Sequence, residues 1–139
     1  MSLNSFATNI DILHRAMSAQ LVRRSVIADN LANADVPGFK RSNVNFESEL
    51  KRALESRKQK PALELELTHS KHIPNHRERD YRDVGIRRVL DYSSTYNNNG
   101  NNVDPEQEHM LALQNQMAYS LLAHSASFQF NQINIALRR

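Results

Sequence analysis

The clearest candidates for metal chemistry are three histidines, His69, His72 and His76, which are spaced H-x2-H-x3-H. Three imidazole nitrogens can bind zinc. Pro74 would interrupt a helix that aligned the three rings, and the neighbouring acidic residues do not stand at ligand spacing. A solvated loop is therefore the favoured interpretation over a metal-dependent enzyme, and we predict no metal and no cofactor.

The remaining histidines do not indicate catalysis either. His14, His109 and His124 fall in segments predicted to be helical, and only His14 has a carboxylate at helical spacing, that of Asp11. The chain contains no cysteine, no phosphate-binding glycine loop and no G-x-S-x-G nucleophile motif. We therefore predict that the protein is not an enzyme and has no catalytic residues.

Charge and hydropathy narrow the classes of partner. Basic pairs such as Arg23-Arg24 and Arg87-Arg88 are mostly interspersed with acidic residues, and the net charge is only +3. No nucleic-acid-binding signature accompanies them, so a nucleic-acid-binding helical protein is a weaker alternative. Apolar runs are only a few residues long, and the N-terminus lacks the features of a cleaved signal peptide. We predict no nucleic acid partner, no membrane insertion and no signal-peptide cleavage.

The elements that would position any site are best defined at the C-terminus. Residues 109–137 contain no Asp, Glu, Lys or Arg. Asp104 followed by Pro105 is typical of a helix start, with the aspartate as N-cap. No glycine or proline follows, so we predict a helix over 104–139, about 50 Å long at the standard rise.

Apolar and uncharged residues of this helix repeat with heptad spacing. The main stripe consists of Leu111, Gln114, Ala118, Leu121, Ser125, Phe128, Gln132 and Ile135. A second stripe beside it consists of Met110, Leu113, Met117 and Leu122. Several amides, those of Gln114, Asn115, Gln129, Asn131, Gln132 and Asn134, can pair with neighbours and fix their register. A helix with so much apolar surface requires partners on several sides.

The N-terminal segment has a similar character. Five apolar residues form one stripe, namely Leu3, Phe6, Ile10, Leu13 and Met17. The pattern predicts a helix from about residue 4 to residue 33, comparable in length to the C-terminal helix. Val36-Pro37-Gly38 should end this region, because the residue before proline avoids helical geometry and Pro-Gly fits a type II turn.

The middle of the chain gives weaker signals. Residues 44–58 are amphipathic and predict a short helix. Leu63, Leu65 and Leu67 alternate with glutamates and predict a short strand, and a second strand is expected near 85–92. Most of the rest reads as loop, including the asparagine-rich run at 97–102.

Together these elements predict a mainly α fold in which two long terminal helices pair as an antiparallel, coiled-coil-like hairpin. We expect the N-terminal helix in 1–35, an irregular middle with short β segments in 36–102, and the C-terminal helix in 103–139. The charge-free helix and the scarcity of other core-forming sequence favour an interaction or structural protein whose long helices pack on other chains.

Two motifs also carry a resemblance. The sequence ADNLANADVPGFKR at 28–41 resembles the motif that closes the N-terminal helix of bacterial flagellar rod and hook proteins, and the matching positions are Asn30, Asn33, Ala34, Asp35, Pro37, Gly38 and Phe39. The sequence GNNVDPEQE at 100–108 resembles the motif that opens their C-terminal helix, at Gly100, Asn102, Val103, Asp104, Glu106 and Glu108. With THSKHI at 68–73 and a length near 140, the proximal rod proteins are the most similar members.

The chain departs from the family pattern at three positions. Phe39 stands where tyrosine is commoner, Pro105 where an aliphatic residue is usual, and Asn99 where aspartate often precedes the glycine. A sibling proximal rod protein and a non-flagellar helical interaction protein remain as alternatives.

The resemblance implies a subunit of a helical polymer, a structural protein of the flagellar basal body that forms the proximal rod and transmits torque from the membrane rotor to the hook. It implies export by the flagellar type III apparatus without cleavage, and assembly in the periplasm. Expected partners are further copies of the chain, other rod proteins, and the adaptor associated with the export gate and the MS ring. Subunit packing is expected at Leu3, Phe6, Ile10, Leu13, Met17, Leu111, Ala118, Leu121, Phe128 and Ile135.

Overall fold

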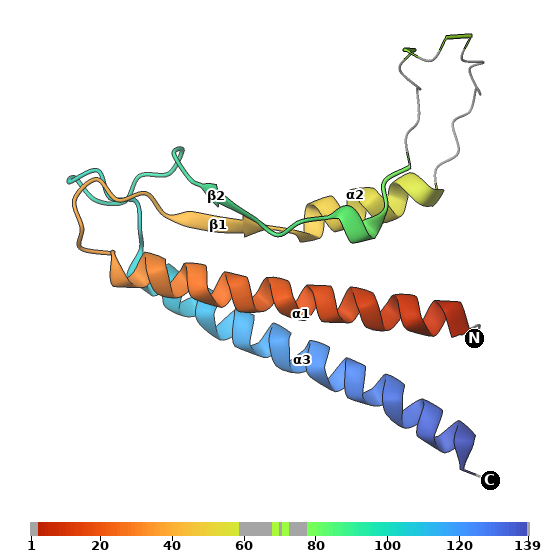
Figure 1. Ribbon diagram of the computed structural model, residues 1–139. Helices are drawn as coiled ribbons and strands as arrows, with labels where there is room; N and C mark the ends of the chain where they lie inside the picture. Colours follow the sequence, from red (N-terminus) through yellow and green to blue (C-terminus); the bar gives the residue numbers. More distant parts are fainter. Residues whose placement is uncertain (1–2, 59–67, 70, 73–77, 139) are drawn as a thin grey trace. The chain divides into compact units, whose positions relative to one another are not determined.

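The structure is a computed structural model of the chain, and it describes residues 3–58, 68–69, 71–72 and 78–138 (Figure 1). The elements, in chain order, are α1 (Leu3–Ala32), β1 (Ser42–Asn45), α2 (Glu47–Lys58), η1 (Tyr81–Asp83), β2 (Arg87–Leu90) and α3 (Pro105–Leu137). The chain divides into two units, one formed by Met1–Val44 with Arg88–Arg139 and one by Asn45–Arg87.

The first unit is built on the two long terminal helices. In Figure 1, α1 and α3 lie side by side and run in opposite directions, so that both chain ends lie at the same end of the hairpin. The observed helix bounds agree with the predicted helices at 4–33 and 104–139 to within a few residues. The predicted mainly α class with a paired helical hairpin and short β segments is therefore confirmed.

Two contacts fix the register of this hairpin. The Asn115 side chain donates to the Gln20 backbone oxygen at 3.1 Å and to its Oε1 at 2.6 Å. Phe6 lies on α1 fourteen residues before Gln20, and its ring meets the Phe130 ring edge-on, with centroids 5.9 Å apart. Because Phe130 lies fifteen residues beyond Asn115, the two antiparallel helices keep one register between these points.

The face that α3 turns to α1 differs from the predicted heptad stripe. Buried or half-buried side chains follow one another at Leu111, Asn115, Ala118, Leu122, Ala126, Gln129 and Ile133. Of the predicted stripe, only Leu111 and Ala118 lie on this face, whereas Leu121, Phe128 and Ile135 are exposed. Apolar residues occur around most of the circumference of α3, so residue type alone did not identify the side that pairs.

The predicted packing residues of α1 all have a similar degree of burial where the structure describes their side chains. Phe6, Ile10, Leu13 and Met17 are all half-buried. The side chain of Leu3 lies outside the described part of the structure. Buried positions in the described chain are polar as often as they are apolar, and α3, which is described throughout, buries only Glu108 and Asn115. The hairpin therefore combines half-buried apolar side chains of both helices with the buried polar residue Asn115, which bonds to Gln20.

A two-stranded antiparallel sheet of β1 and β2 connects the helix-ending turn of α1 to the loop before α3. The strand β2 falls within the 85–92 range predicted from the sequence. Asn30 on α1 forms a double hydrogen bond with the first residue of β1, since its Oδ1 accepts from the Ser42 N–H and its Nδ2 donates to the Ser42 oxygen, both at 2.9 Å. This side chain therefore pairs with the strand as a neighbouring strand would.

The second unit contains α2 and η1, which pack against each other. Its buried residues include Phe46, Ala53 and Tyr81. The helix α2 begins at Glu47, three residues later than predicted, because residues up to Asn45 belong to β1. The predicted strand at Leu63, Leu65 and Leu67 lies outside the described residues.

Among the described residues, each helix is either too short or too polar to span a lipid bilayer.

Candidate functional site: a polar clamp between the two long helices

The two sequence motifs meet where α1 ends and α3 begins. We call this region the clamp and define it as residues 30–42 and 99–108. Gly38 donates its N–H to the Asn99 oxygen at 3.1 Å, and Lys40 Nζ donates to the Gly100 oxygen at 2.7 Å. A Cβ on Gly100 would lie 3.8 Å from the Gly38 Cα, so the two loops are in van der Waals contact. The clamp therefore joins segments about sixty residues apart in the chain.

The turn after α1 has the geometry that its sequence predicts. Pro37 and Gly38 occupy the central positions, and the Phe39 N–H donates to the Val36 oxygen at 3.3 Å. Gly38 has a φ of +72°, the left-handed conformation required at the third position of a type II turn. The predicted turn is confirmed, and it sends the chain from α1 into β1.

Replacing Gly38 with valine should therefore destabilise the clamp. No atom lies within 4 Å of a Cβ at this position, so the penalty comes from the backbone and should be about 1–2 kcal/mol in the free energy of unfolding. Urea unfolding followed by circular dichroism measures it. Gly38→Asn is the matched control, because asparagine tolerates positive φ better. Equal stability of the valine variant and the unaltered protein would contradict the strain argument.

Asn101 binds the turn that follows α1. Its Nδ2 lies 2.9 Å from the Asn33 oxygen and 2.8 Å from the oxygens of Ala34 and Val36, and it donates to all three. Its Oδ1 accepts from the Val103 N–H at 2.7 Å. The side chain is buried. Because these three oxygens belong to the turn that follows α1, Asn101 fixes this turn to the loop before α3.

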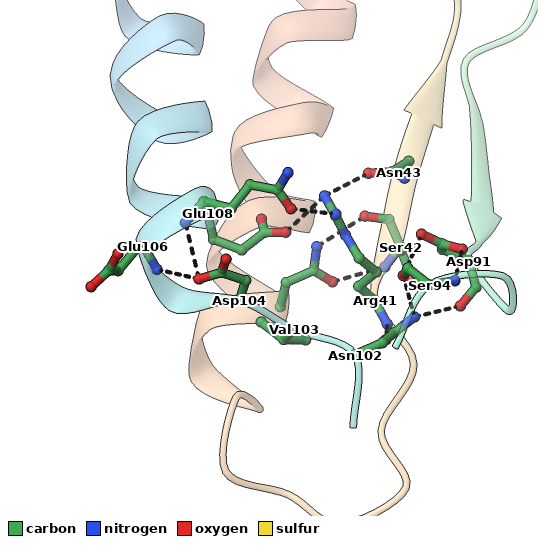
Figure 2. A network of polar contacts seen from close by, with 12 residues as sticks. Arg41, Ser42, Asn43, Asp91, Ser94, Asn102, Val103, Asp104, Glu106 and Glu108 are labelled. Atoms are coloured by element: carbon green, nitrogen blue, oxygen red, sulfur yellow. Dashed lines mark hydrogen bonds and ion pairs between the residues drawn. The ribbon is translucent and has the colours of Figure 1, made fainter. Parts of the chain in front are cut away.

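Asn102 connects the clamp to the sheet (Figure 2). Its Oδ1 accepts from the Arg41 N–H at 2.7 Å, and its Nδ2 donates to the Asp91 oxygen at 2.7 Å and to Ser94 Oγ at 3.0 Å. The Asp91 N–H in turn donates to the Arg41 oxygen at 2.9 Å. The side-chain hydrogen bonds from Ser94 and Ser93 lower the pKa of Asp91 to about 2.

Figure 2 also shows Arg41 reaching into the first turns of α3. Arg41 Nη2 lies 3.1 Å from Glu108 Oε1, and its Nη1 donates to Gln107 Oε1 at 2.7 Å. The same guanidinium donates to Asn43 Oδ1 at 3.3 Å. Glu108 is only 1% exposed, so this is a buried ion pair rather than a surface one. One side chain therefore joins the beginning of β1 to α3.

Burial raises the pKa of Glu108 above its ordinary value of 4.5, and the charge of Asp104 adds to the rise. The nearby Asn30 amide and Arg41 guanidinium act in the opposite direction without cancelling it. Between pH 4.5 and the raised pKa, the folded chain binds more protons than the unfolded chain. Glu108 therefore makes the folded state less stable as the pH rises through this window.

Glu108→Gln should remove this dependence. We expect the melting temperature of the unaltered protein to fall, relative to that of the variant, as the pH is raised from about 4.5 towards neutrality. Thermal unfolding by circular dichroism at several pH values tests this. Asp91 does not interfere with this measurement, because its lowered pKa of about 2 confines its contribution to the pH dependence of stability to more acidic solutions. Parallel pH profiles for the two proteins would contradict the assignment.

The start of α3 is capped as predicted. Asp104 Oδ1 accepts from the N–H groups of Glu106 and Gln107 at 3.0 and 3.3 Å, and Pro105 occupies the first helical position. Val103, immediately before the cap, is fully buried. The departure from the family pattern at Pro105 therefore leaves a normal helix start, because the missing N–H would have had no partner within the helix.

The structure thus brings together most of the motif residues that the resemblance singles out. Asn30, Gly38, Gly100, Asn102, Asp104 and Glu108 lie in direct contacts of the clamp. Ala34 and Val103 are buried there, whereas Asp35, Pro37 and Glu106 have exposed side chains and Phe39 is half-buried. Asn33 contributes its backbone oxygen to the bond with Asn101.

Two central residues were not identified from the sequence. Arg41 ends the first motif and Asn101 belongs to both the second motif and the asparagine-rich run, but no structural role was predicted for either side chain. The available signal was positional, because Asn101 and Asn102 lie shortly before the N-cap Asp104 and Arg41 lies shortly after the turn that ends at Phe39. Nothing in the sequence indicated that Arg41 would pair with Glu108 or that Asn101 would bind the turn after α1.

The histidine group does not form a site among the described residues. His69 and His72 have exposed side chains with ring centroids 5.7 Å apart, and His76 lies outside the described residues. No three potential metal ligands gather anywhere in the part of the chain that the structure describes. His14, His109 and His124 are exposed on the long helices.

Comparisons with known proteins agree with the motifs. The family model described as "Flagella basal body rod protein" matches residues 10–40, which include most of α1 and the turn after it. The flagellar basal body rod protein FlgB of Borreliella burgdorferi is 43% identical over 98% of this chain and all of its own length. The FlgB protein of Borrelia hermsii is 41% identical over the same shares, and that of Bacillus subtilis is 28% identical over 97% of both chains.

The clamp is thus built from the two segments whose sequences resemble the family motifs, and the similarity to the two spirochaete proteins extends over nearly the whole chain. The chain belongs to the FlgB family of flagellar basal body rod proteins.

Proposed function

We propose that this chain is a structural subunit of the proximal flagellar rod and transmits torque through its helical hairpin without catalysing a reaction. Rod neighbours would pack against the uncharged surface of α3, and the clamp would keep the two helices together under load. The proposal includes the expectations of export by the type III apparatus without cleavage, a periplasmic position, and contacts with the export-gate and MS-ring adaptor.

The observation that carries the proposal is an exposed row of large apolar side chains on α3. Met110, Met117, Leu121, Phe128 and Ile135 are each 61–73% exposed, and we call this row the α3 ridge. Large apolar rows of this kind mark surfaces that bind other molecules. No formal charge lies between Glu108 and Arg138, so burying the ridge against another subunit leaves no charge without a partner.

Torque transmission requires the hairpin to resist deformation. Close-packed protein interiors have low compressibility and pass strain from one element to the next. The clamp fixes one end of α1 to α3, and the Gln20–Asn115 and Phe6–Phe130 contacts fix their register further along. A twisting force applied to one helix is therefore passed to the other along most of the hairpin.

Leu121→Asp tests the proposal. The side chain is 73% exposed, so we expect the melting temperature of the isolated protein to stay within a few degrees of the unaltered value. In cells that depend on the variant, we expect loss of swimming and absence of the chain from isolated basal bodies, because a carboxylate would be buried at each contact.

Leu121→Met is the matched control, since it keeps an apolar side chain of similar volume and should support swimming. Phe128→Asp should behave like Leu121→Asp. Normal swimming with both aspartate variants would refute the packing role of the ridge.

A further inference from the structure

We propose that Asn99 is a site of spontaneous deamidation, and that the isoaspartate formed there loosens the clamp. The reacting pair is Asn99 and Gly100, which lie in the loop before α3. The other two glycines follow proline and valine, so this is the only asparagine–glycine pair in the chain. The modification changes the covalent structure of the chain and is independent of the proposed role in the rod.

The reaction needs only the chain and water. The backbone nitrogen of Gly100 attacks Cγ of Asn99, so that a new N–Cγ bond forms. The Cγ–Nδ2 bond breaks, and ammonia leaves with the proton that the Gly100 amide gives up. The product is a cyclic imide, and water then opens it at one of its two carbonyl groups. Opening at one carbonyl gives aspartate and opening at the other gives isoaspartate, with no change of oxidation state.

The turn holds the Asn99 side chain near the attacking nitrogen. Asn99 Oδ1 accepts a hydrogen bond from the Asn101 N–H at 3.0 Å. Because this bond spans Gly100, the side-chain carbonyl is folded forward over the peptide bond between residues 99 and 100. The same hydrogen bond draws electron density away from Cγ and makes it more reactive towards a nucleophile. The folded chain therefore favours ring closure at this position.

The reacting groups are also open to solvent. Asn99 and Gly100 are both exposed, so water and hydroxide reach the peptide bond. Gly100 has no Cβ to crowd the attacked carbon, and its φ of +80° is a conformation that glycine adopts without strain. The Gly100 N–H donates to the Asn97 oxygen at 3.2 Å, but this bond lies in an exposed loop where water can replace it.

The other asparagines of the run at 97–102 lack one of these conditions. Asn97 and Asn98 are exposed, but each is followed by another asparagine, whose side chain crowds the attacking nitrogen. Asn101 and Asn102 are only 1% and 3% exposed, and their side-chain amides are held by hydrogen bonds. Within this run, deamidation should therefore be concentrated at Asn99.

The two products have different effects on the clamp. Aspartate keeps the normal backbone and an acceptor for the Asn101 N–H. In isoaspartate the backbone continues through the side chain of residue 99, which inserts one CH2 before Gly100. The oxygen that accepts from the Gly38 N–H at 3.1 Å then becomes part of a free carboxylate. The inserted carbon therefore shifts the Gly38 contact relative to Asn101, which holds the turn after α1.

Incubation of the purified chain in warm, mildly alkaline buffer tests the site. Chymotrypsin cuts after Tyr96, and fragment masses of the peptide that begins at Asn97 assign each deamidation to a residue. We expect Asn99 to react roughly tenfold faster than Asn98, its internal control, because glycine leaves the attacking nitrogen open. Labelling with protein isoaspartate methyltransferase identifies the isoaspartate product. Equal rates at Asn98 and Asn99, or an Asn99 that stays intact in the folded chain, would overturn the assignment.

The effect on the clamp is measured on the incubated protein. We expect hydrogen exchange of the Gly38 amide to be roughly tenfold faster in the isoaspartate fraction, because its acceptor has changed, and the melting temperature to fall. The methyltransferase with S-adenosylmethionine converts isoaspartate to aspartate, so this treatment should reverse both changes. Unchanged Gly38 exchange in the isoaspartate fraction would overturn the loosening of the clamp.

Two variants separate the effects of the products. Asn99→Asp keeps the acceptor for the Asn101 N–H and should melt at the temperature of the fresh unaltered protein. Asn99→Gln closes a larger ring much more slowly, so its melting temperature should not change during the incubation. A fall for Asn99→Gln as large as that of the unaltered protein would show that the damage lies elsewhere in the chain. A melting temperature of Asn99→Asp as low as that of the incubated protein would contradict the role given to isoaspartate.

Discussion

Replacing Arg41 with alanine should lower the free energy of unfolding by about 3–5 kcal/mol. The substitution leaves the carboxylate of Glu108 buried without its cationic partner, which lies 3.1 Å away in the intact protein. It also removes the hydrogen bonds that the guanidinium donates to Gln107 and Asn43. Because the Arg41 side chain ties the beginning of β1 to the start of α3, its removal should weaken the contact between the two motifs. Urea unfolding followed by circular dichroism measures the loss.

The matched control is Arg88→Ala. Arg88 forms an ion pair of similar length with Asp29, at 3.0 Å, but both side chains are about half exposed. Exposed pairs contribute about 0–1 kcal/mol, so this variant should be close to the unaltered protein. The double variant Arg41→Ala/Glu108→Gln should recover part of the loss, because it removes the isolated charge. Equal effects of Arg41→Ala and Arg88→Ala would show that burial of the pair is unimportant.

Asn101→Ala should be almost as damaging, with a loss of about 2–4 kcal/mol. The substitution removes the donor shared by the backbone oxygens of Asn33, Ala34 and Val36, and the acceptor for the Val103 N–H. The Asn33 and Val36 oxygens keep the hydrogen bonds that they accept from the N–H groups of Val36 and Phe39, so the loss arises mainly at the Ala34 oxygen and the Val103 N–H. Hydrogen exchange of the α1 amides should increase most towards Ala32, since the frayed end opens first.

Asn98→Ala is the matched control for this substitution. Asn98 belongs to the same asparagine run but is exposed, so its replacement should change the free energy of unfolding by less than about 0.5 kcal/mol. Asn101→Asp distinguishes the donor role of the Asn101 side chain from its acceptor role. It keeps the acceptor for Val103 but places a carboxylate against three carbonyl oxygens, and so it should be no more stable than Asn101→Ala. Full stability of Asn101→Asp would contradict the donor role.

Local sequence signals predicted the ends of the helices well. Asp104 and Pro105 start α3, and Pro37 and Gly38 turn the chain after α1, because caps and turns depend on residues a few positions apart. The secondary structure of the middle of the chain was predicted less accurately. The helix predicted from residue 44 begins at Glu47, since the first residues of the predicted range belong to β1.

The face of α3 that pairs with α1 was not predictable in the same way. The stripe with Leu121, Phe128 and Ile135 has the heptad spacing expected of a pairing face, but these residues point outward. The pairing face instead includes Asn115, whose bond to Gln20 lies between residues 95 positions apart. Several faces of α3 have enough apolar character to pair, so the choice depended on contacts distant in sequence.

The sequence by itself determined that the chain forms two long helices with defined ends, that the C-terminal one is almost free of charge, and that two motifs of a flagellar family stand at the ends that meet. Those properties follow from spacing, capping and turn chemistry, which act over a few residues. Only the tertiary structure decided that Asn101 binds the turn after α1, that Arg41 pairs with Glu108, and which side of α3 faces outward. Each of these depends on groups more than sixty residues apart, whose approach is set by how the whole hairpin packs and leaves no pattern in the local sequence.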